Sequence, residues 1–118
     1  MIVVLDDSRA RFLRREDSGR FAKAMPDVSA AERKDNSASG DRTQRRREFL
    51  RAVMVVLDQA CDRNQWDRLI AVGPERMLSA FRKAASDKVR VRLWREAATE
   101  PNGLNDIELE KRLAPLFR

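Results

Sequence analysis

The chain has 118 residues, which is enough for one domain with a hydrophobic core and too few for two. Its 42% hydrophobic and 37% charged residues are typical of a globular protein whose surface carries both signs of charge. Lysine and arginine (25) exceed aspartate and glutamate (19), and the net charge of +6 fits either an anionic partner or a basic soluble surface.

Missing residue types exclude several classes of site. There is no histidine and one cysteine, Cys61, so an internal disulfide, the usual zinc ligand sets and histidine-based catalysis are excluded. No apolar run is long enough to span a membrane, and MIVVLDD at the N-terminus lacks the features of a signal peptide. We therefore expect a cytoplasmic location. We also expect no cofactor, since VGPERM (72–77) lacks the glycines and lysine of a nucleotide-binding loop.

The N-terminal part of the sequence predicts a three-stranded antiparallel meander. Residues 2–5 (IVVL) form a continuous apolar run, which is typical of a buried central strand. Residues 10–16 and 20–25 are two further predicted strands, and the turn signal between them (DSG, 17–19) is short enough for a hairpin.

A mobile loop is predicted at residues 26–41, which are rich in Pro, Ser, Asn and Gly. Asp41 and Gln44 match a capping box, so a long helix is expected over about residues 42–63. Its apolar residues follow helical spacing: Phe49, Val53, Val56, Leu57 and Ala60.

Strands and helices alternate in the second half. Residues 67–73 contain an apolar run that predicts a strand, and Pro74 is suited to the first position of a helix. Residues 89–94 (VRVRLW) alternate strictly and predict another strand. Asn105 and Glu108 repeat the capping pattern and predict the start of a last helix.

The predicted order is βββαβαβα in a single α/β domain spanning residues 1–118. The strands of the βα units should lie parallel beside the first strand, which gives a five-stranded mixed sheet flanked by helices. This arrangement is ribonuclease H-like.

A metal-dependent nuclease of that fold requires converging carboxylates on the first strand, the long helix and the fourth strand. Asp6 or Asp7 and Glu48 can supply two of them, but the fourth predicted strand ends in AVG (71–73). The missing carboxylate disfavours nuclease activity, and we expect Asp6 and Asp7 to be turn residues.

Several short elements point to a family. One is SRARF, and another is WDRL followed by a predicted strand, a proline and a helix. Together with their surroundings they resemble the bacterial host attachment protein family, over residues 6–15, 64–86 and 94–116. The resemblance implies a role in attachment to host cells. Because the sequence offers no complete catalytic constellation and nothing that suits secretion, we expect a non-enzymatic cytoplasmic factor that acts indirectly. Protein partners are a further candidate.

The host attachment family is in turn similar to the middle domain of archaeal and eukaryotic release factors and of Pelota, which shares the predicted order of elements. In release factors, the loop that enters the long helix carries Gly-Gly-Gln. Residues 39–44 read SGDRTQ here, so peptide release is not expected.

A basic cluster marks the start of the long helix, the end that favours anions. Ribosomal or other structured RNA is one candidate partner, because side-chain charges and backbone N–H groups can both bind phosphates there. The alternative is a solvated face whose arginines pair with Glu48, Asp58 or a neighbouring strand. The candidate RNA- or phosphate-binding residues are Arg42, Gln44, Arg45, Arg46, Arg47 and Arg51.

Tryptophans and the cysteine offer weaker candidates. Arg90, Arg92 and Trp94 would share one face of the last strand, as a stacking platform for single-stranded RNA or beneath a covering helix. Trp66 is expected to pack at a helix end, and Cys61 to be an inert buried thiol.

Overall fold

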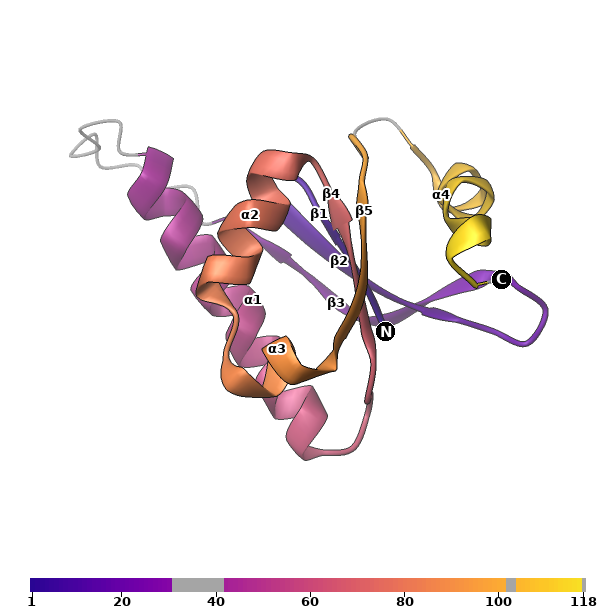
Figure 1. The fold of residues 1–118 in the computed structure, drawn as a ribbon, viewed down its shortest axis with the longest axis horizontal. Coiled ribbons are helices and arrows are strands. Elements are labelled where there is room, and N and C mark those ends of the chain that lie inside the picture. Colours follow the sequence, from indigo (N-terminus) through magenta and orange to yellow (C-terminus); the bar gives the residue numbers. More distant parts are fainter. Residues whose placement is uncertain (31–41, 102–103, 118) are drawn as a thin grey trace.

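The computed structural model describes residues 1–30, 42–101 and 104–117, except for the side chain of Arg42. Five strands form one sheet in the order β3-β2-β1-β4-β5 (Figure 1). The first three strands pair antiparallel, and β1, β4 and β5 pair parallel, so the predicted mixed sheet is confirmed. The strands are β1 (Ile2–Leu5), β2 (Arg9–Arg15), β3 (Phe21–Ser29), β4 (Leu69–Gly73) and β5 (Leu93–Ala98).

Helices cover both faces of the sheet. On one side lie α1 (Arg42–Asp62), α2 (Glu75–Ala84) and α3 (Asp87–Arg92) (Figure 1). On the other lie α4 (Asp106–Leu113) and a short 3-10 helix (Ala114–Phe117) (Figure 1). Among the described residues, none of the helices is long and apolar enough to cross a membrane.

Strand β1 is buried on both faces because it lies at the centre of the sheet between two layers of helices. Val3 and Leu5 belong to the core on the α1 side, whereas Ile2 and Val4 belong to the core on the α4 side. Side chains alternate between the faces of a strand, so a continuous apolar run is what this position requires.

The predicted strand at residues 89–94 is wrong for its first four residues. Residues 87–92 form helix α3, and the strand begins at Leu93. The Ser86 hydroxyl caps this helix by accepting the N–H of Val89 at 3.3 Å. Val89 is fully buried while Val91 is 77% exposed, so the two valines do not share a buried strand face. The order in the described residues is therefore βββαβααβα, followed by the 3-10 helix.

The predicted loop at residues 26–41 is also wrong at its start, because residues 26–29 belong to β3. Residues 31–41, with Asp41 of the predicted capping box, lie outside the described part of the chain. Pro26 is tolerated because β3 is an edge strand and its register shifts between Met25 and Val28. The other boundaries differ from the predicted ones by a few residues at most.

Two predicted helix ends are confirmed. Asn105 caps α4 by accepting the N–H of Glu108 at 2.9 Å. Trp66 lies just beyond the end of α1 and is 7% exposed. Its indole N–H donates to the carbonyl of Leu57 in that helix at 2.9 Å. Cys61 is buried in the same core, as predicted.

The end of α1 is closed by a turn with the hydrogen bonds of a Schellman motif. The N–H of Gln65 donates to the carbonyl of Ala60, and the N–H of Asn64 donates to the carbonyl of Cys61. Asn64 has a φ of 59°, the left-handed conformation that asparagine tolerates better than most residues.

The junction between β4 and α2 is a tight connection, as predicted. A Cβ atom on Gly73 would lie 2.7 Å from the carbonyl oxygen of Leu5, so glycine permits the close approach of β4 to β1. Pro74 is the N-cap of α2 rather than its first helical residue.

Candidate functional site

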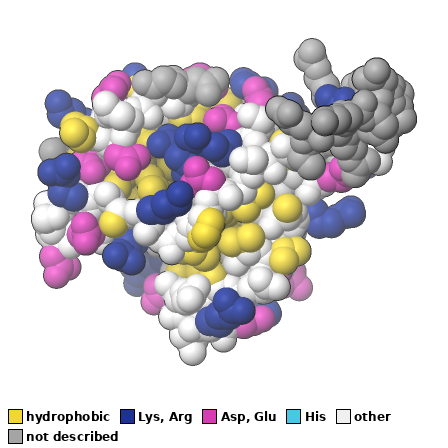
Figure 2. All heavy atoms as spheres, turned by 180° about the vertical axis from the view of Figure 1, so that it is seen from behind, with side chains coloured by type: hydrophobic (Ala, Val, Ile, Leu, Met, Phe, Trp, Pro, Cys, Tyr) yellow, Lys and Arg dark blue, Asp and Glu magenta, His cyan; other side chains and the backbone are white. Residues whose placement is uncertain are grey.

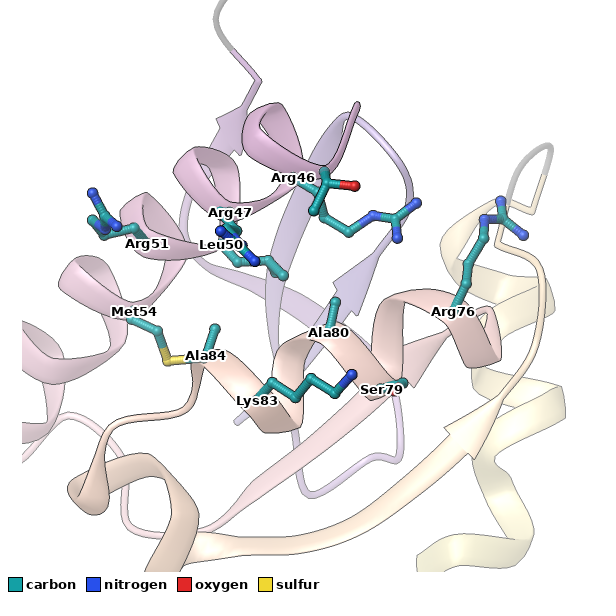
Figure 3. A pocket seen from close by; sticks show the side chains of 11 residues that line it. Arg46, Arg47, Leu50, Arg51, Met54, Arg76, Ser79, Ala80, Lys83 and Ala84 are labelled. Carbon is teal, nitrogen blue, oxygen red and sulfur yellow. The ribbon is translucent and has the colours of Figure 1, made fainter. Parts of the chain in front are cut away.

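A groove lies between α1 and α2 on the outer side of the helical layer, with a volume of about 540 Å³ (Figure 3). It is lined on α1 by Thr43, Arg46, Arg47, Leu50, Arg51 and Met54. On α2 it is lined by Arg76, Ser79, Ala80, Lys83 and Ala84.

Helical spacing explains why these residues share one groove. Residues three, four and seven apart lie on the same side of a helix, which is the spacing of the lining residues on both helices. On α2 three of the five lining residues are small, namely Ser79, Ala80 and Ala84, so they do not fill the valley between the helices. Leu50 and Met54 are 1% and 6% exposed, and they form an apolar floor.

Most of the cations that line the groove make no ion pair with the described residues. Within residues 1–30, 42–101 and 104–117, no ion pair is made by Arg46, Arg47, Arg51 or Lys83. The first turn of α1 contains no acidic residue, so no carboxylate of that turn offsets the partial positive charge of the helix start. The groove therefore has a positive rim.

Arg76 is the exception among the cations that line the groove. Its guanidinium pairs with Asp7 at 2.7 Å and with Glu100 at 3.6 Å. The hydrogen bond to Asp7 raises the pKa of Arg76, and the two carboxylates hold the guanidinium at one end of the groove.

Three of the sequence-predicted residues line the groove: Arg46, Arg47 and Arg51. Gln44 and Arg45 are exposed on α1 but do not line it. Figure 3 shows Arg46 extending toward the end where Arg76 lies, whereas the Arg51 guanidinium points away from α2. Arg42 is the first residue of α1, and its side chain lies outside the described part.

The alternative prediction was a solvated face with salt-bridged arginines, and the described residues show neither of the two named pairs. In the described part of the chain, Arg46, Arg47 and Arg51 pair with neither Glu48 nor Asp58. The Asp58 carboxylate instead accepts the hydroxyl of Ser86 at 2.6 Å.

Sequence interpretation missed the contribution of α2. Arg76 and Lys83 are seven residues apart, which places them on one side of a helix. That spacing is a usable sequence signal for a basic face of α2, in addition to the buried apolar face. Which exposed face of α2 meets α1 is decided by how the two helices pack.

The predicted turn role of Asp6 is confirmed. Its carboxylate accepts the N–H groups of Ser8 at 2.8 Å and Arg9 at 2.7 Å. Asp7, the other candidate for a metal-binding carboxylate, pairs with Arg76. In the described residues, no three acidic or cysteine side chains are grouped so that they could hold a metal ion.

The predicted stacking platform is wrong. Arg90 and Arg92 lie in α3, where their guanidinium groups donate to backbone carbonyls. Trp94, at the start of β5, is 44% exposed. Its ring is contacted by Arg68 and Arg95, whose guanidinium carbons lie 5.4 Å and 4.5 Å from the ring centroid.

Elsewhere the surface charge is mixed. Figure 2 shows the molecule from behind, with basic and acidic side chains interspersed around hydrophobic side chains near the middle. The positive rim of the groove is thus a local feature and not a consequence of net charge alone.

The family model described as bacterial archaeo-eukaryotic release factor family 12 matches residues 18–113. The chain belongs to this family. Two solved structures have a similar fold: an archaeal translation termination factor, aRF1, with a TM-score of 0.54 at 8% identity, and an archaeal protein with a TM-score of 0.55 at 9% identity. No curated protein matches.

This family member covers only part of those structures. The matches include 98% of this chain, but 38% of the termination factor and 37% of the archaeal protein. The predicted likeness to release factors is confirmed for family and fold. The name of host attachment protein stays a prediction.

Proposed function

We propose that this release factor family domain is a non-enzymatic cytoplasmic factor that binds structured RNA, including ribosomal RNA, through the basic groove between α1 and α2. The observation that carries the proposal is the set of four cations on the groove rim that make no ion pair with described residues: Arg46, Arg47, Arg51 and Lys83.

Unpaired cations are suited to phosphates for a physical reason. An arginine already bound to a carboxylate must give up that contact to bind RNA, whereas an unpaired one loses only water and exchanges loosely held ions. The counterions released from the nucleic acid then favour binding, more strongly at low salt. Arginine also presents a planar fork of N–H donors that matches two phosphate oxygens.

The relation to release factors supports the choice of RNA over another polyanion. The similar archaeal structure is a translation termination factor, and its fold extends over nearly the whole of this chain. Peptide release itself is not proposed, because Gly-Gly-Gln is absent from the sequence. We therefore infer a binding role in translation without a catalytic step.

The test compares two triple variants that each remove three positive charges. One carries Arg46→Ala, Arg47→Ala and Arg51→Ala. The matched control carries Arg14→Ala, Arg63→Ala and Lys111→Ala, at exposed sites away from the groove that make no ion pair with described residues. Binding of each protein to ribosomes and to a labelled RNA hairpin is measured across a salt series.

Wild type and control should bind with a steep salt dependence. The groove variant should lose affinity, and its slope of log K against log salt should become shallower by roughly 2 to 3, about 0.7 to 0.9 for each lost phosphate contact. If the two variants lost the same affinity for RNA, binding would depend only on the net charge of the protein. That result would contradict a role for the groove.

The resemblance to host attachment proteins supports a second role, an indirect one in attachment exerted from the cytoplasm through protein partners. Deleting the gene should then lower attachment, and the wild-type protein should restore it from the cytoplasmic fraction. Full restoration by the groove variant would separate this role from RNA binding, and normal attachment without the gene would exclude it.

A further inference from the structure

We infer that the groove holds one unpaired nucleotide of the bound RNA, with its base against the α2 wall and apolar floor and its phosphate among the unpaired cations. This inference rests on the proposed RNA binding and names the part of the RNA that the site would take. A bulged or looped-out nucleotide, rather than a paired one, is the expected ligand.

The size of the groove favours a small group. Its volume of about 540 Å³ falls within the range of about 300–1,000 Å³ that is usual for small-ligand sites. A paired strand turns its bases inward and presents only its sugar–phosphate surface, which would touch the rim and leave the floor empty. An extruded base can enter the groove while its own phosphate stays at the rim.

The floor and walls provide complementary surfaces for a flat ring. Ala80 and Ala84 leave a slot along α2, and Met54 closes it from α1 at the end where Ala84 lies (Figure 3). The Met54 sulfur can contact a ring, guanidinium planes can stack on a base, and the Ser79 hydroxyl can bond to a base edge.

The unpaired cations determine where the phosphate lies. Arg76 is held by Asp7 and Glu100, so its positive charge is largely offset at that end of the groove. Arg46, Arg47 and Lys83 make no ion pair with the described part of the chain, and they come from both walls. A phosphate bound among them meets cations from α1 and α2 together.

A peptide helix is a poorer fit to the same groove. Helix-in-groove recognition buries several large apolar side chains in a hydrophobic surface. Leu50 and Met54 are already buried by this chain, and the small alanines add little apolar surface. What remains is enough for one flat ring but gives few anchors to a helix.

The experiment separates the contribution of the base to RNA binding from that of the positive charges. The probes are a fluorescein-labelled RNA hairpin with one bulged uridine and the same hairpin without the bulge, measured by anisotropy. The test variant is Ala84→Leu, which fills the slot at an exposed position and leaves every charge in place. The control is Ala52→Leu, the same change at an exposed position of α1 that does not line the groove.

Wild type and Ala52→Leu should prefer the bulged hairpin by about tenfold, the scale of one stacked base. Ala84→Leu should bind both hairpins alike while keeping the salt dependence of the wild type. Equal binding of the two hairpins by wild type, or an unchanged preference in Ala84→Leu, would overturn the inference. The proposed function would still stand if the triple arginine variant lost binding to the paired hairpin.

A different pattern would overturn both proposals. If wild-type protein bound neither hairpin but bound an acidic peptide, and Ala84→Leu lost that binding, the groove would be a protein site.

Discussion

On the α4 side of the sheet, two arginines pair with carboxylates of α4, and the arginines that line the groove on α1 differ from them. Arg11 of β2 pairs with Asp106 at 3.3 Å, and Arg20 at the β2–β3 turn pairs with Glu110 at 3.3 Å. Both contacts connect α4 to the meander. The arginines of α1 that line the groove make no ion pair with described residues.

The difference shows that one residue type serves two purposes in this domain. An exposed ion pair contributes only about 0–1 kcal/mol, so the α4 pairs matter chiefly where burial and hydrogen bonds add to them. Unpaired arginines close together cost some stability through repulsion. The net charge of +6 is a total over the whole chain, so it does not distinguish the paired arginines from the unpaired ones.

The largest expected effect in this comparison is on the α4 side, at Glu110. Its side chain is 13% exposed, accepts the N–H of Phe21 at 2.7 Å and pairs with Arg20. Glu110→Ala should lower the free energy of unfolding by about 2–3 kcal/mol, because it removes a charge-assisted bond and leaves a part-buried N–H without its acceptor. Urea denaturation measures this loss.

Two further variants make that test specific. Glu110→Gln keeps an acceptor for the N–H of Phe21 and should recover part of the loss. Glu108→Ala removes an exposed carboxylate from the first turn of α4 and should cost less than about 1 kcal/mol. If Glu108→Ala and Glu110→Ala cost the same, the proposed difference between exposed and part-buried contacts is wrong.

The same comparison shows why the sheet was predictable from sequence and α3 was not. The run IVVL has apolar residues on both faces, and only a central strand between two helical layers requires that. Residues 89–94 also alternate, but six residues are too few to separate a strand from one exposed turn of helix. Ser86, which caps α3, was the overlooked signal.

The candidate site was predictable on α1 alone. The arginines of α1 are adjacent in sequence, so the basic cluster is visible without the structure. The other wall is built by Ser79, Ala80 and Lys83, which are unremarkable in sequence and matter because of how α2 packs beside α1. A groove is a property of two elements, so the pattern within either one does not reveal it.

The smallest expected effect, and the one that bears most on the comparison, is at Arg47. Arg47 and Arg51 are four residues apart on α1, where like charges repel by a few tenths of a kcal/mol. Arg47→Glu replaces this repulsion with a favourable pair in the better orientation and should stabilise the protein by about 0.5–1 kcal/mol.

The same change should weaken binding of the RNA hairpin, because it places a negative charge on the groove rim. Arg47→Gln, which only removes the repulsion, should give about half the gain in stability and a smaller loss of RNA binding. Urea denaturation and anisotropy measure the two effects on the same samples. If Arg47→Glu raises the free energy of unfolding and lowers the affinity for RNA, α1 keeps its arginines for binding at a cost in stability. If Arg47→Glu lowers the free energy of unfolding, Arg47 instead supports the fold, as the arginines that pair with α4 do.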